Sequence, residues 1–310
     1  MDSQDYSLLD CGDGAKLERF GEIVLQRPAP QCLWARRDPQ AWQSARACYL
    51  RSSEGGGEWQ ERAPLPQEWW IDCAGLRLRL SATGFGHIGV FPEQFPFWDY
   101  LRAECGSGEP GPRVLNLFAY TGGASIAAAQ GGARVTHCDG SKGIVQWASQ
   151  NAAANGYADR ETASASGGRI RWIIDDAGRF VARELRRKRQ YEGIILDPPS
   201  FGRGPKGQVW KLERDLQAHL SQLVRLISET PRFLLVSAHT PGVDPLSLQN
   251  LLEASFVAAA RASSLERGHL ACGSMTIRET EGGRQLPSGT WAIWSRSGAL
   301  PKAPSLREPA

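Results

Sequence analysis

Short runs of apolar residues alternate with longer, helix-like stretches from about residue 113 onward. The apolar runs occupy residues 113–118, 134–138, 170–174, 193–196 and 232–236, and two further strands are expected near 269–279 and 290–296. The helix-like stretches occupy residues 124–130, 141–155, 209–228 and 246–262, and a basic helix follows the third apolar run. Strands that are apolar throughout are typical of a parallel sheet with helices on both faces. The pattern therefore predicts an α/β, doubly wound fold.

The beginning of the chain has a different pattern. Residues 22–25 and 76–80 read as short strands, the second because its polar and apolar residues alternate strictly. Frequent glycine, proline and tryptophan between them indicate a small β-rich lobe with loops, in which the tryptophans are packing residues rather than a platform for stacked bases. We expect this lobe at residues 1–84, an α/β domain at 85–298 and a disordered tail at 299–310.

The composition is that of a globular protein with length for about two domains. The chain has 310 residues, of which 41% are hydrophobic and 22% charged. No apolar run approaches the roughly 20 residues that a membrane-spanning helix needs. The acidic start, MDSQDYSLLD, lacks the pattern of a secretory signal. We therefore expect a cytoplasmic protein without a membrane partner.

Cysteine usage and charge narrow the classes further. The seven cysteines are scattered and include no C-x-x-C pair, so reduced, mostly buried thiols are expected, without disulfides or a metal site. A net charge of +3 is too small for a protein that coats RNA. One basic cluster, residues 179–189, is either a solvated helix face or an RNA contact.

Polar residues follow the apolar strands, at the edge where open parallel sheets bind their ligands. Residues 116–123 form a glycine-bearing turn into a helix after the first strand. Asp139 follows the second strand, Asp175 and Asp176 follow the third, and the sequence Asp-Pro-Pro-Ser-Phe at 197–201 follows the fourth. Each signal alone is weak, because an acidic residue after a strand is often a helix cap.

Taken together, these signals discriminate between cofactors. The first turn reads Thr-Gly-Gly-Ala-Ser and lacks the G-x-G-x-x-G pattern, which disfavours hydride chemistry on NAD. Acidic residues after the second and third strands suit a nucleoside without a pyrophosphate. Asp139 is placed to hold the ribose and Asp176 to meet the adenine amino group, while Asp175 is placed as a cap of the following helix. S-adenosylmethionine is held in this way.

The motifs carry a family resemblance. Residues 116–123, 139–142, 151–156, 176–177 and 197–201 resemble the class I S-adenosylmethionine-dependent methyltransferases, which have a Rossmann-like sheet. Residues 89–94 resemble the bacterial branch related to the 23S ribosomal RNA large-subunit methyltransferases, and residues 8–21 and 202–212 narrow this to a subgroup without an assigned substrate. The resemblance implies cofactor contacts from Phe91, Gln94, Asn116, Phe118, Tyr120, Thr121, Gly122, Asp139, Ser141, Lys142, Asp176, Ala177 and Asp197.

The sequence also departs from that branch in two respects. Residues 1–82 have no evident counterpart of the PUA-type RNA-binding module, so substrate capture must differ. The cytosine-C5 members resemble one another in a nucleophilic cysteine after the fifth strand, where this chain reads Ser237-Ala238-His239-Thr240. Carbon-5 methylation needs a thiolate that attacks the ring, so this chemistry is not expected here.

In-line transfer of a methyl group from sulfonium to nitrogen or oxygen needs positioning rather than a covalent step. The carboxylate of Asp197 or the carbonyl of Pro198 is placed to accept a hydrogen bond from the acceptor, and Phe201 to stack on a flat base. Asp197, Pro198 and Phe201 are therefore the candidate catalytic residues. His239 reads as either a base or a structural histidine.

The leading interpretation is an enzyme, a methyltransferase of RNA, with ribosomal RNA favoured as the partner. A small molecule or a protein as the methyl acceptor is the first alternative. A non-catalytic nucleotide-binding scaffold is the second, and the joint presence of the acidic residues and the Asp-Pro-Pro turn speaks against it. The sequence leaves the oligomeric state open.

Overall fold

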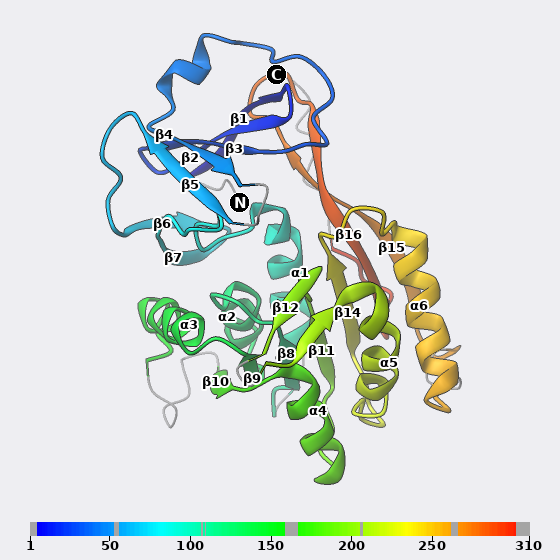
Figure 1. The fold of residues 1–310 in the computed structure, drawn as a ribbon. Helices are drawn as coiled ribbons and strands as arrows, with labels where there is room; N and C mark the ends of the chain where they lie inside the picture. Colours follow the sequence, from blue (N-terminus) through cyan, green and yellow to red (C-terminus); the bar gives the residue numbers. More distant parts are fainter. Residues whose placement is uncertain are drawn as a thin grey trace. The chain divides into compact units, whose positions relative to one another are not determined.

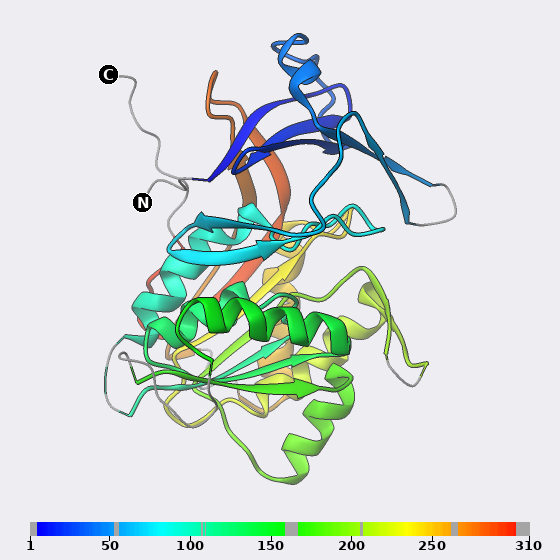
Figure 2. The ribbon, with the colours of Figure 1, turned by 90° about the vertical axis from the view of Figure 1, so that its left-hand side faces the viewer.

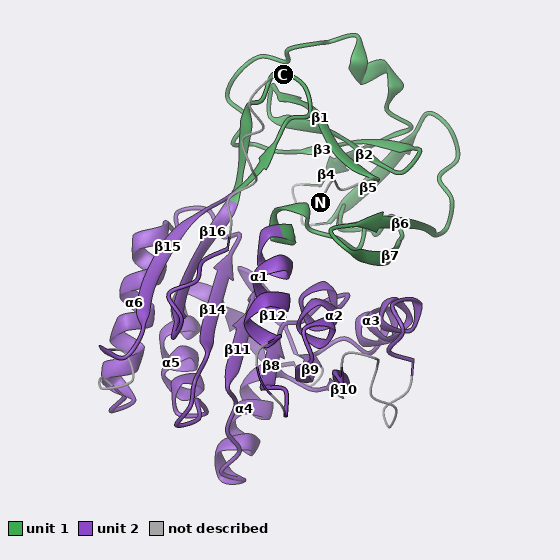
Figure 3. Cartoon of the chain, turned by 180° about the vertical axis from the view of Figure 1, so that it is seen from behind, with its two compact units in different colours: residues 1–95, 276–288, 306–310 green, residues 96–275, 289–305 purple. Residues whose placement is uncertain are grey.

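A computed structural model describes residues 5–52, 56–106, 108, 110–158, 167–204, 207–261 and 266–301. The chain divides into two compact units (Figure 3), each of which is described by itself. Unit 1 contains residues 1–95 and 276–288, and unit 2 contains residues 96–275 and 289–305. This division differs from the one expected at residue 84, because residues 85–95 and 276–288 group with the β-rich unit. The tail expected from residue 299 lies almost entirely outside the described residues.

Unit 2 is built on a seven-stranded sheet with the order β10-β9-β8-β11-β14-β16-β15. Five neighbouring strands, β10 to β14 in that order, are parallel, and β16 runs antiparallel to β14. The strands are β8 (Arg113–Leu117), β9 (Arg134–Asp139), β10 (Arg169–Ile174), β11 (Gly193–Leu196), β14 (Phe233–Ala238), β15 (His269–Arg278) and β16 (Gln285–Ser295). The doubly wound α/β fold expected from the apolar runs is confirmed, since the five parallel runs form the middle of one sheet.

Helices cover both faces of this sheet (Figures 1 and 2), with α3 and α4 on opposite sides. The helices are α1 (Phe95–Cys105), α2 (Gly123–Gln130), α3 (Lys142–Ala154), α4 (Ala177–Arg186), α5 (Leu212–Val224) and α6 (Pro245–Ala258). Helix α6 begins where polar residues specify a start, since Asp244 caps the Ser247 N–H and Pro245 is the first helical residue. Strands β11 and β14 are buried along their whole length between the helical layers, as their apolar sequences require.

One helix begins later than expected. Residues 209–211, expected to be helical, form strand β13 (Val209–Lys211), which pairs with β12 (Phe201–Arg203), and α5 starts only at Leu212. A β-branched residue and a tryptophan favour the extended conformation here. The indole N–H of Trp210 donates to the Pro199 carbonyl at 2.7 Å, which ties the hairpin to the preceding turn.

Unit 1 contains a five-stranded sheet with the order β1-β2-β3-β4-β5 and a separate hairpin, β6–β7. The strands are β1 (Tyr6–Gly12), β2 (Ala15–Phe20), β3 (Ile23–Pro28), β4 (Ala47–Arg51), β5 (Gly57–Glu61), β6 (Trp69–Cys73) and β7 (Leu76–Leu80), with short 3-10 helices at Ala41–Ser44 and Pro92–Gln94. The leucines of β7 are buried and its arginines face outward more, as the strict alternation predicts. The β-rich lobe expected from the sequence is confirmed.

A buried carboxylate organises one end of unit 1. Asp10 accepts hydrogen bonds from the indole of Trp42 at 2.8 Å and from the backbone of Arg37 and Asp38 at 3.1 Å. The guanidinium of Arg284, from the second segment of the unit, pairs with the same carboxylate at 2.7 Å. Trp42 is therefore a packing residue with a satisfied N–H, as the sequence analysis expects of the lobe's tryptophans.

Among the described residues, no helix combines the length and the apolar character that a membrane crossing requires.

Candidate active site

The turn after β8 has an unusual backbone. Phe118 and Tyr120 have φ of 53° and 49°, and Gly122 has φ of 90°. Left-handed non-glycine residues cost on the order of 1–3 kcal/mol each, so neighbouring groups must hold them. The Tyr120 N–H donates to the Asp139 carboxylate at 3.1 Å, and the side-chain amide of Asn151 donates to the Thr121 carbonyl at 2.9 Å. The turn is therefore fixed from β9 and from α3.

Two glycines allow the turn to enter α2. A Cβ on Gly122 would lie 3.1 Å from the Ala148 Cβ, and a Cβ on Gly123 would lie 2.3 Å from the ring of Trp98. Gly123 therefore tolerates no larger residue unless the Trp98 ring moves, while Gly122 additionally needs its left-handed conformation.

Asn116 lies below this turn, inside the core. Its side-chain amide donates to Ser125 Oγ at 2.9 Å, and Ser125 Oγ lies 3.0 Å from His137 Nδ1. Burial lowers the pKa of His137 to about 3, so this ring is neutral at pH 7. The structure thus uses the Asn116 side chain to join β8 to α2 and β9, and a cofactor contact from it stays a prediction.

Asp139 ends β9 and is held by backbone amides. Its two oxygens accept the N–H groups of Tyr120 at 3.1 Å and of Ser141 at 2.9 Å. Burial raises the pKa of its carboxyl group. Each carboxylate oxygen has two acceptor positions, so one on each remains for a ligand such as a diol. Ser141 caps α3 through the Ile144 N–H, and Lys142 is the exposed first residue of that helix.

Two acidic residues, Asp175 and Asp176, follow β10, and the cap of the next helix is not the one that the sequence predicts. Asp176, not Asp175, caps α4, because its Oδ1 accepts the Arg179 N–H at 2.9 Å. Asp175 is buried and pairs with Arg183 at 2.6 Å. The capping role expected of Asp175 is therefore wrong. Asp176 keeps Oδ2 for another donor, close to where a Cβ on Gly204 would lie, and Ala177 is the buried first residue of α4.

The Asp-Pro-Pro turn follows β11 and is connected to the end of β14. The Ser237 hydroxyl donates to Asp197 Oδ1 at 2.6 Å, and His239 Nε2 lies 3.7 Å from the same oxygen. Three residues after Asp197 and Ser237, respectively, the hydroxyls of Ser200 and Thr240 are 2.8 Å apart. The Ser237 hydroxyl thus positions the Asp197 carboxylate, whereas the sequence of this stretch indicated only the lack of a cysteine and a base or structural role for His239.

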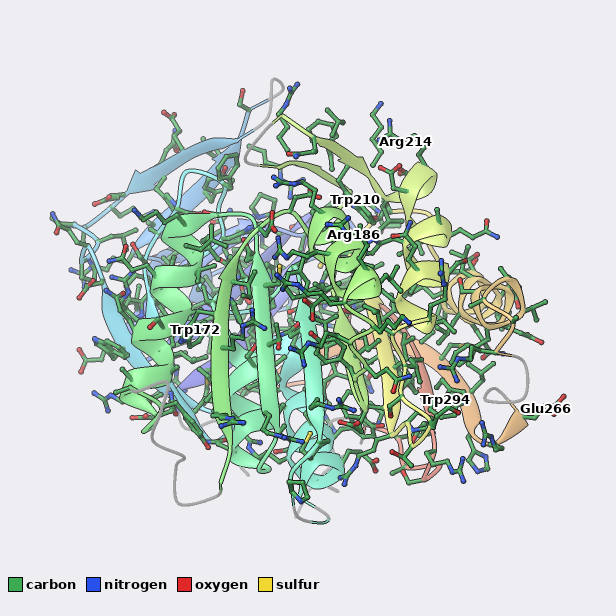
Figure 4. All side chains as sticks on the ribbon, turned by 90° about the horizontal axis from the view of Figure 1, so that it is seen from below. Trp172, Arg186, Trp210, Arg214, Glu266 and Trp294 are labelled. Atoms are coloured by element: carbon green, nitrogen blue, oxygen red, sulfur yellow. The ribbon has the colours of Figure 1, made fainter. Side chains whose placement is uncertain are left out.

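Phe201 begins the β12–β13 hairpin and is 52% exposed. In the other strand of this hairpin, the ring of Trp210, labelled in Figure 4, packs against the rings of Phe118 and His219, with centroids 5.1 and 5.5 Å apart. Burial lowers the pKa of His219 to about 4. Trp210 lies within residues 202–212, which carry part of the family resemblance, but no role at the site was predicted for it. The signal that could have found it is the isolated aromatic residue beside a β-branched one ahead of the helix.

The remaining expected site residues divide between the units. Phe91 is the N-cap and Gln94 the last residue of the 3-10 helix Pro92–Gln94 in unit 1, and their expected cofactor contacts stay predictions. Cys138 precedes Asp139 but is fully buried, and burial raises the pKa of its thiol. All seven cysteines are free. Within the described part of the chain, no group of three or more His, Cys, Asp or Glu side chains is arranged to hold a metal ion.

The chain is similar to a known protein family and to solved structures. A family model described as S-adenosylmethionine-dependent methyltransferase matches residues 34–267. A solved SAM-dependent methyltransferase from Agrobacterium tumefaciens is 34% identical and superimposes with a TM-score of 0.85 over 95% of this chain and 91% of its own. A proposed methyltransferase named SMU.776, solved in complex with SAH, is 18% identical with a TM-score of 0.69 over 95% of this chain and 76% of its own, and it shows the fold alone.

Curated relatives match a smaller part. Ribosomal RNA large subunit methyltransferase K/L from Shewanella frigidimarina is 33% identical over 177 residues, which cover 56% of this chain and 23% of that protein. The same enzyme from Shewanella baltica is 34% identical over 158 residues, covering 50% of this chain and 20% of its own length. The match thus spans about a fifth of the length of these relatives.

Proposed function

Because the chain belongs to the S-adenosylmethionine-dependent methyltransferase family, we propose that it methylates RNA, with ribosomal RNA as the first candidate substrate. S-adenosylmethionine is the methyl donor of the family. What is proposed here is the acceptor and the roles of individual residues. The carrying observation is the turn at Asp197, where a carboxylate fixed by Ser237 lies four residues before an exposed aromatic ring.

The polar groups at the carboxyl ends of the strands fit the nucleoside part of S-adenosylmethionine. Asp139 offers two acceptor positions to the ribose hydroxyls, since each of its oxygens accepts only one backbone N–H. Asp176 offers Oδ2 to the adenine amino group while Oδ1 caps α4. Helix α2 begins after Gly122 without a side-chain cap, and the N–H groups of a helix's first turn bind a carboxylate favourably.

The acceptor side supports transfer to nitrogen or oxygen. The donor brings a methyl group on sulfonium, so the protein has only to hold the nucleophile in line with it. The carboxylate of Asp197 or the carbonyl of Pro198 accepts a hydrogen bond from the acceptor group, and Phe201 stacks on its base. The buried thiol of Cys138 is protonated at neutral pH and takes no covalent part.

RNA is favoured over other acceptors by two observations. The curated relatives that match half of the chain are named for ribosomal RNA. The exposed ring of Phe201 lies at the site itself, where a flat base can stack on it. Neither observation is expected of an enzyme that methylates a small molecule or a protein.

The test compares modified nucleosides in total RNA by mass spectrometry. Cells lacking the protein are complemented with the wild-type chain or with Asp197→Ala. One methylated nucleoside should disappear in the deletion strain and return only with the wild-type chain, because the variant loses an interaction formed chiefly in the transition state. Unchanged nucleosides would move the proposal to a small-molecule or protein acceptor. Purified Asp197→Ala should still bind S-adenosylmethionine, which separates lost catalysis from misfolding.

A further inference from the structure

Three arginines lie side by side at the amino ends of the parallel strands. Arg113, Arg134 and Arg169 are the first residues of β8, β9 and β10, and they are partners in the strand register. Residues in register share one face of a sheet, and Arg171, two residues after Arg169, shares it too. Like charges directly opposite one another destabilise a sheet. Such a row needs a compensating negative charge.

Among the described residues, a carboxylate partner is found for one member of the row. Arg113 forms a bidentate pair with Glu192. Arg134 donates to the Gly111 carbonyl at 3.1 Å, which carries no net charge. Arg169 and Arg171 are exposed, and no salt bridge to either is found within the described residues.

A hollow of about 410 Å³ adjoins the row. It is lined by Arg113, Arg134, Arg169 and Arg171, together with Arg189 and Glu184. Glu184 is itself engaged, because it accepts the Tyr191 hydroxyl at 2.8 Å and lies 3.5 Å from Arg187. A second hollow of about 360 Å³ shares Arg113 and Arg134 and adds Arg232. Positive charge therefore continues along this edge.

The structure also separates the basic helix from this row. Arg179 and Arg183 both pair with Asp175, at 3.6 and 2.6 Å. Arg186, labelled in Figure 4, lines a different hollow. Of the cluster at residues 179–189 that the sequence analysis singled out, only Arg189 and the engaged Glu184 side chain are among the residues that line the arginine hollow.

We propose that Arg134, Arg169 and Arg171 of the row, together with Arg189 from the same hollow, bind the phosphate backbone of the RNA substrate. This inference rests on the proposed RNA substrate and adds a second contact, at the sheet edge opposite to Asp139 and Asp197. Guanidinium groups are the side chains best suited to phosphate, because their planar fork donates two parallel hydrogen bonds. Strand β9 has six residues, so the two edges lie roughly 20 Å apart. A contact at that distance contributes to binding and not to the methyl-transfer step.

The test uses Arg169→Gln/Arg171→Gln and measures the affinity for protein-free 23S ribosomal RNA by filter binding over a range of salt concentrations. Arg51→Gln/Arg225→Gln is the matched control, since both arginines are exposed and lie outside the row. Loss of two phosphate contacts should lower the slope of log K against log salt by about 1.4 and the affinity near 0.15 M salt by about tenfold. The control should match the wild-type protein. Calorimetric binding of S-adenosylmethionine should be unchanged in both variants.

Each other outcome contradicts either the arginine contact with RNA or the proposed function. If the wild-type protein binds the RNA and the row variant binds it equally well, the row is not an RNA contact, although the proposed function stands. If the wild-type protein does not bind the RNA, the proposed function fails and this inference with it. If polyglutamate displaces the RNA from the wild-type protein, and if Arg169→Gln/Arg171→Gln weakens the binding of polyglutamate as much as that of RNA, the partner is an acidic protein surface. The single variant Arg171→Gln repeats the comparison should the double variant fail to fold.

Discussion

Asp139 is the residue whose environment makes the clearest pH prediction. Burial raises the pKa of its carboxyl group, and in the proposed binding mode the ribose hydroxyls of the cofactor bind its ionised form. We expect the affinity for S-adenosylmethionine to fall on acidification at a higher pH than an exposed aspartate would give. Asp139→Ala should bind about a hundredfold more weakly, because two charge-assisted hydrogen bonds are lost, and without this pH dependence. Calorimetry between pH 7 and about 5 covers the range.

Through Asp139, acidification affects the stability of the folded protein in the opposite direction to its effect on cofactor binding. The raised pKa means that the folded protein holds this proton more tightly than the unfolded chain does. Asp139 therefore contributes stability below its unfolded pKa, and this contribution is lost as the pH rises through the folded pKa. An affinity that does not change on acidification would show that the ribose binds elsewhere.

The neighbouring acidic residues allow a prediction that separates binding from capping. Asp176→Asn should keep the cap of α4, since asparagine caps as well as aspartate, but weaken cofactor binding. Asp175→Asn loses the pair with Arg183 and should lower the free energy of unfolding while leaving cofactor affinity nearly unchanged. Urea unfolding and calorimetry on both variants decide it. Weakened binding in the Asp175 variant alone would reverse the assignment.

Ser237 is a positioning residue for Asp197. Ser237→Ala removes a 2.6 Å hydrogen bond to the carboxylate, and we expect kcat to fall by about tenfold or more, as for a bond to a charged group of about 1.5–3 kcal/mol. Cofactor affinity should change little. Ser237→Thr keeps a hydroxyl and should restore part of kcat. Equal kcat for the alanine variant and the wild-type enzyme would leave Ser237 a purely structural role.

At the scale of elements, the sequence predicts the parallel strands because burial on both faces demands apolar runs, and those runs mark their own ends. It also indicates Asp139, Asp176 and Asp197, since Asp139 and Asp197 directly follow such runs and Asp176 follows one after Asp175. It does not predict the β12–β13 hairpin, because three-residue strands leave no periodicity to detect. The hydrogen bond from Ser237 to Asp197 joins residues 40 apart, which only the pairing of β11 with β14 brings together.

Helix α2 can be tested through its first glycine. Gly123→Ala places a Cβ 2.3 Å from the Trp98 ring, and overpacking of this kind costs about 1–3 kcal/mol of the free energy of unfolding. Gly143→Ala is the matched control in α3, because no atom lies within 4 Å of its Cβ. The control should be neutral or slightly stabilised. Urea unfolding measures both, and equal midpoints would show that α1 and α2 adjust freely.

At the scale of the whole molecule, the seven cysteines make one prediction together. An RNA carrying 5-fluorocytosine traps enzymes that attack cytosine through a thiolate, but it should form no covalent adduct with this protein, because none of its cysteines occupies the site after β14. Denaturing electrophoresis of the mixture provides the measurement. A stable adduct that disappears in one cysteine variant would return the protein to the cytosine-C5 group.

Unit 1 is completed by residues that the ribosome adds late. Glu279 accepts the Cys11 N–H at 3.0 Å, across 268 residues of sequence, and Arg284 pairs with Asp10. At about 5–20 residues per second, the nascent chain holds Asp10 without this partner for on the order of 15–50 s. The last parallel strand, β14, ends at Ala238, before either partner has been synthesised. During synthesis, therefore, the parallel strands of unit 2 are all available before unit 1 can close.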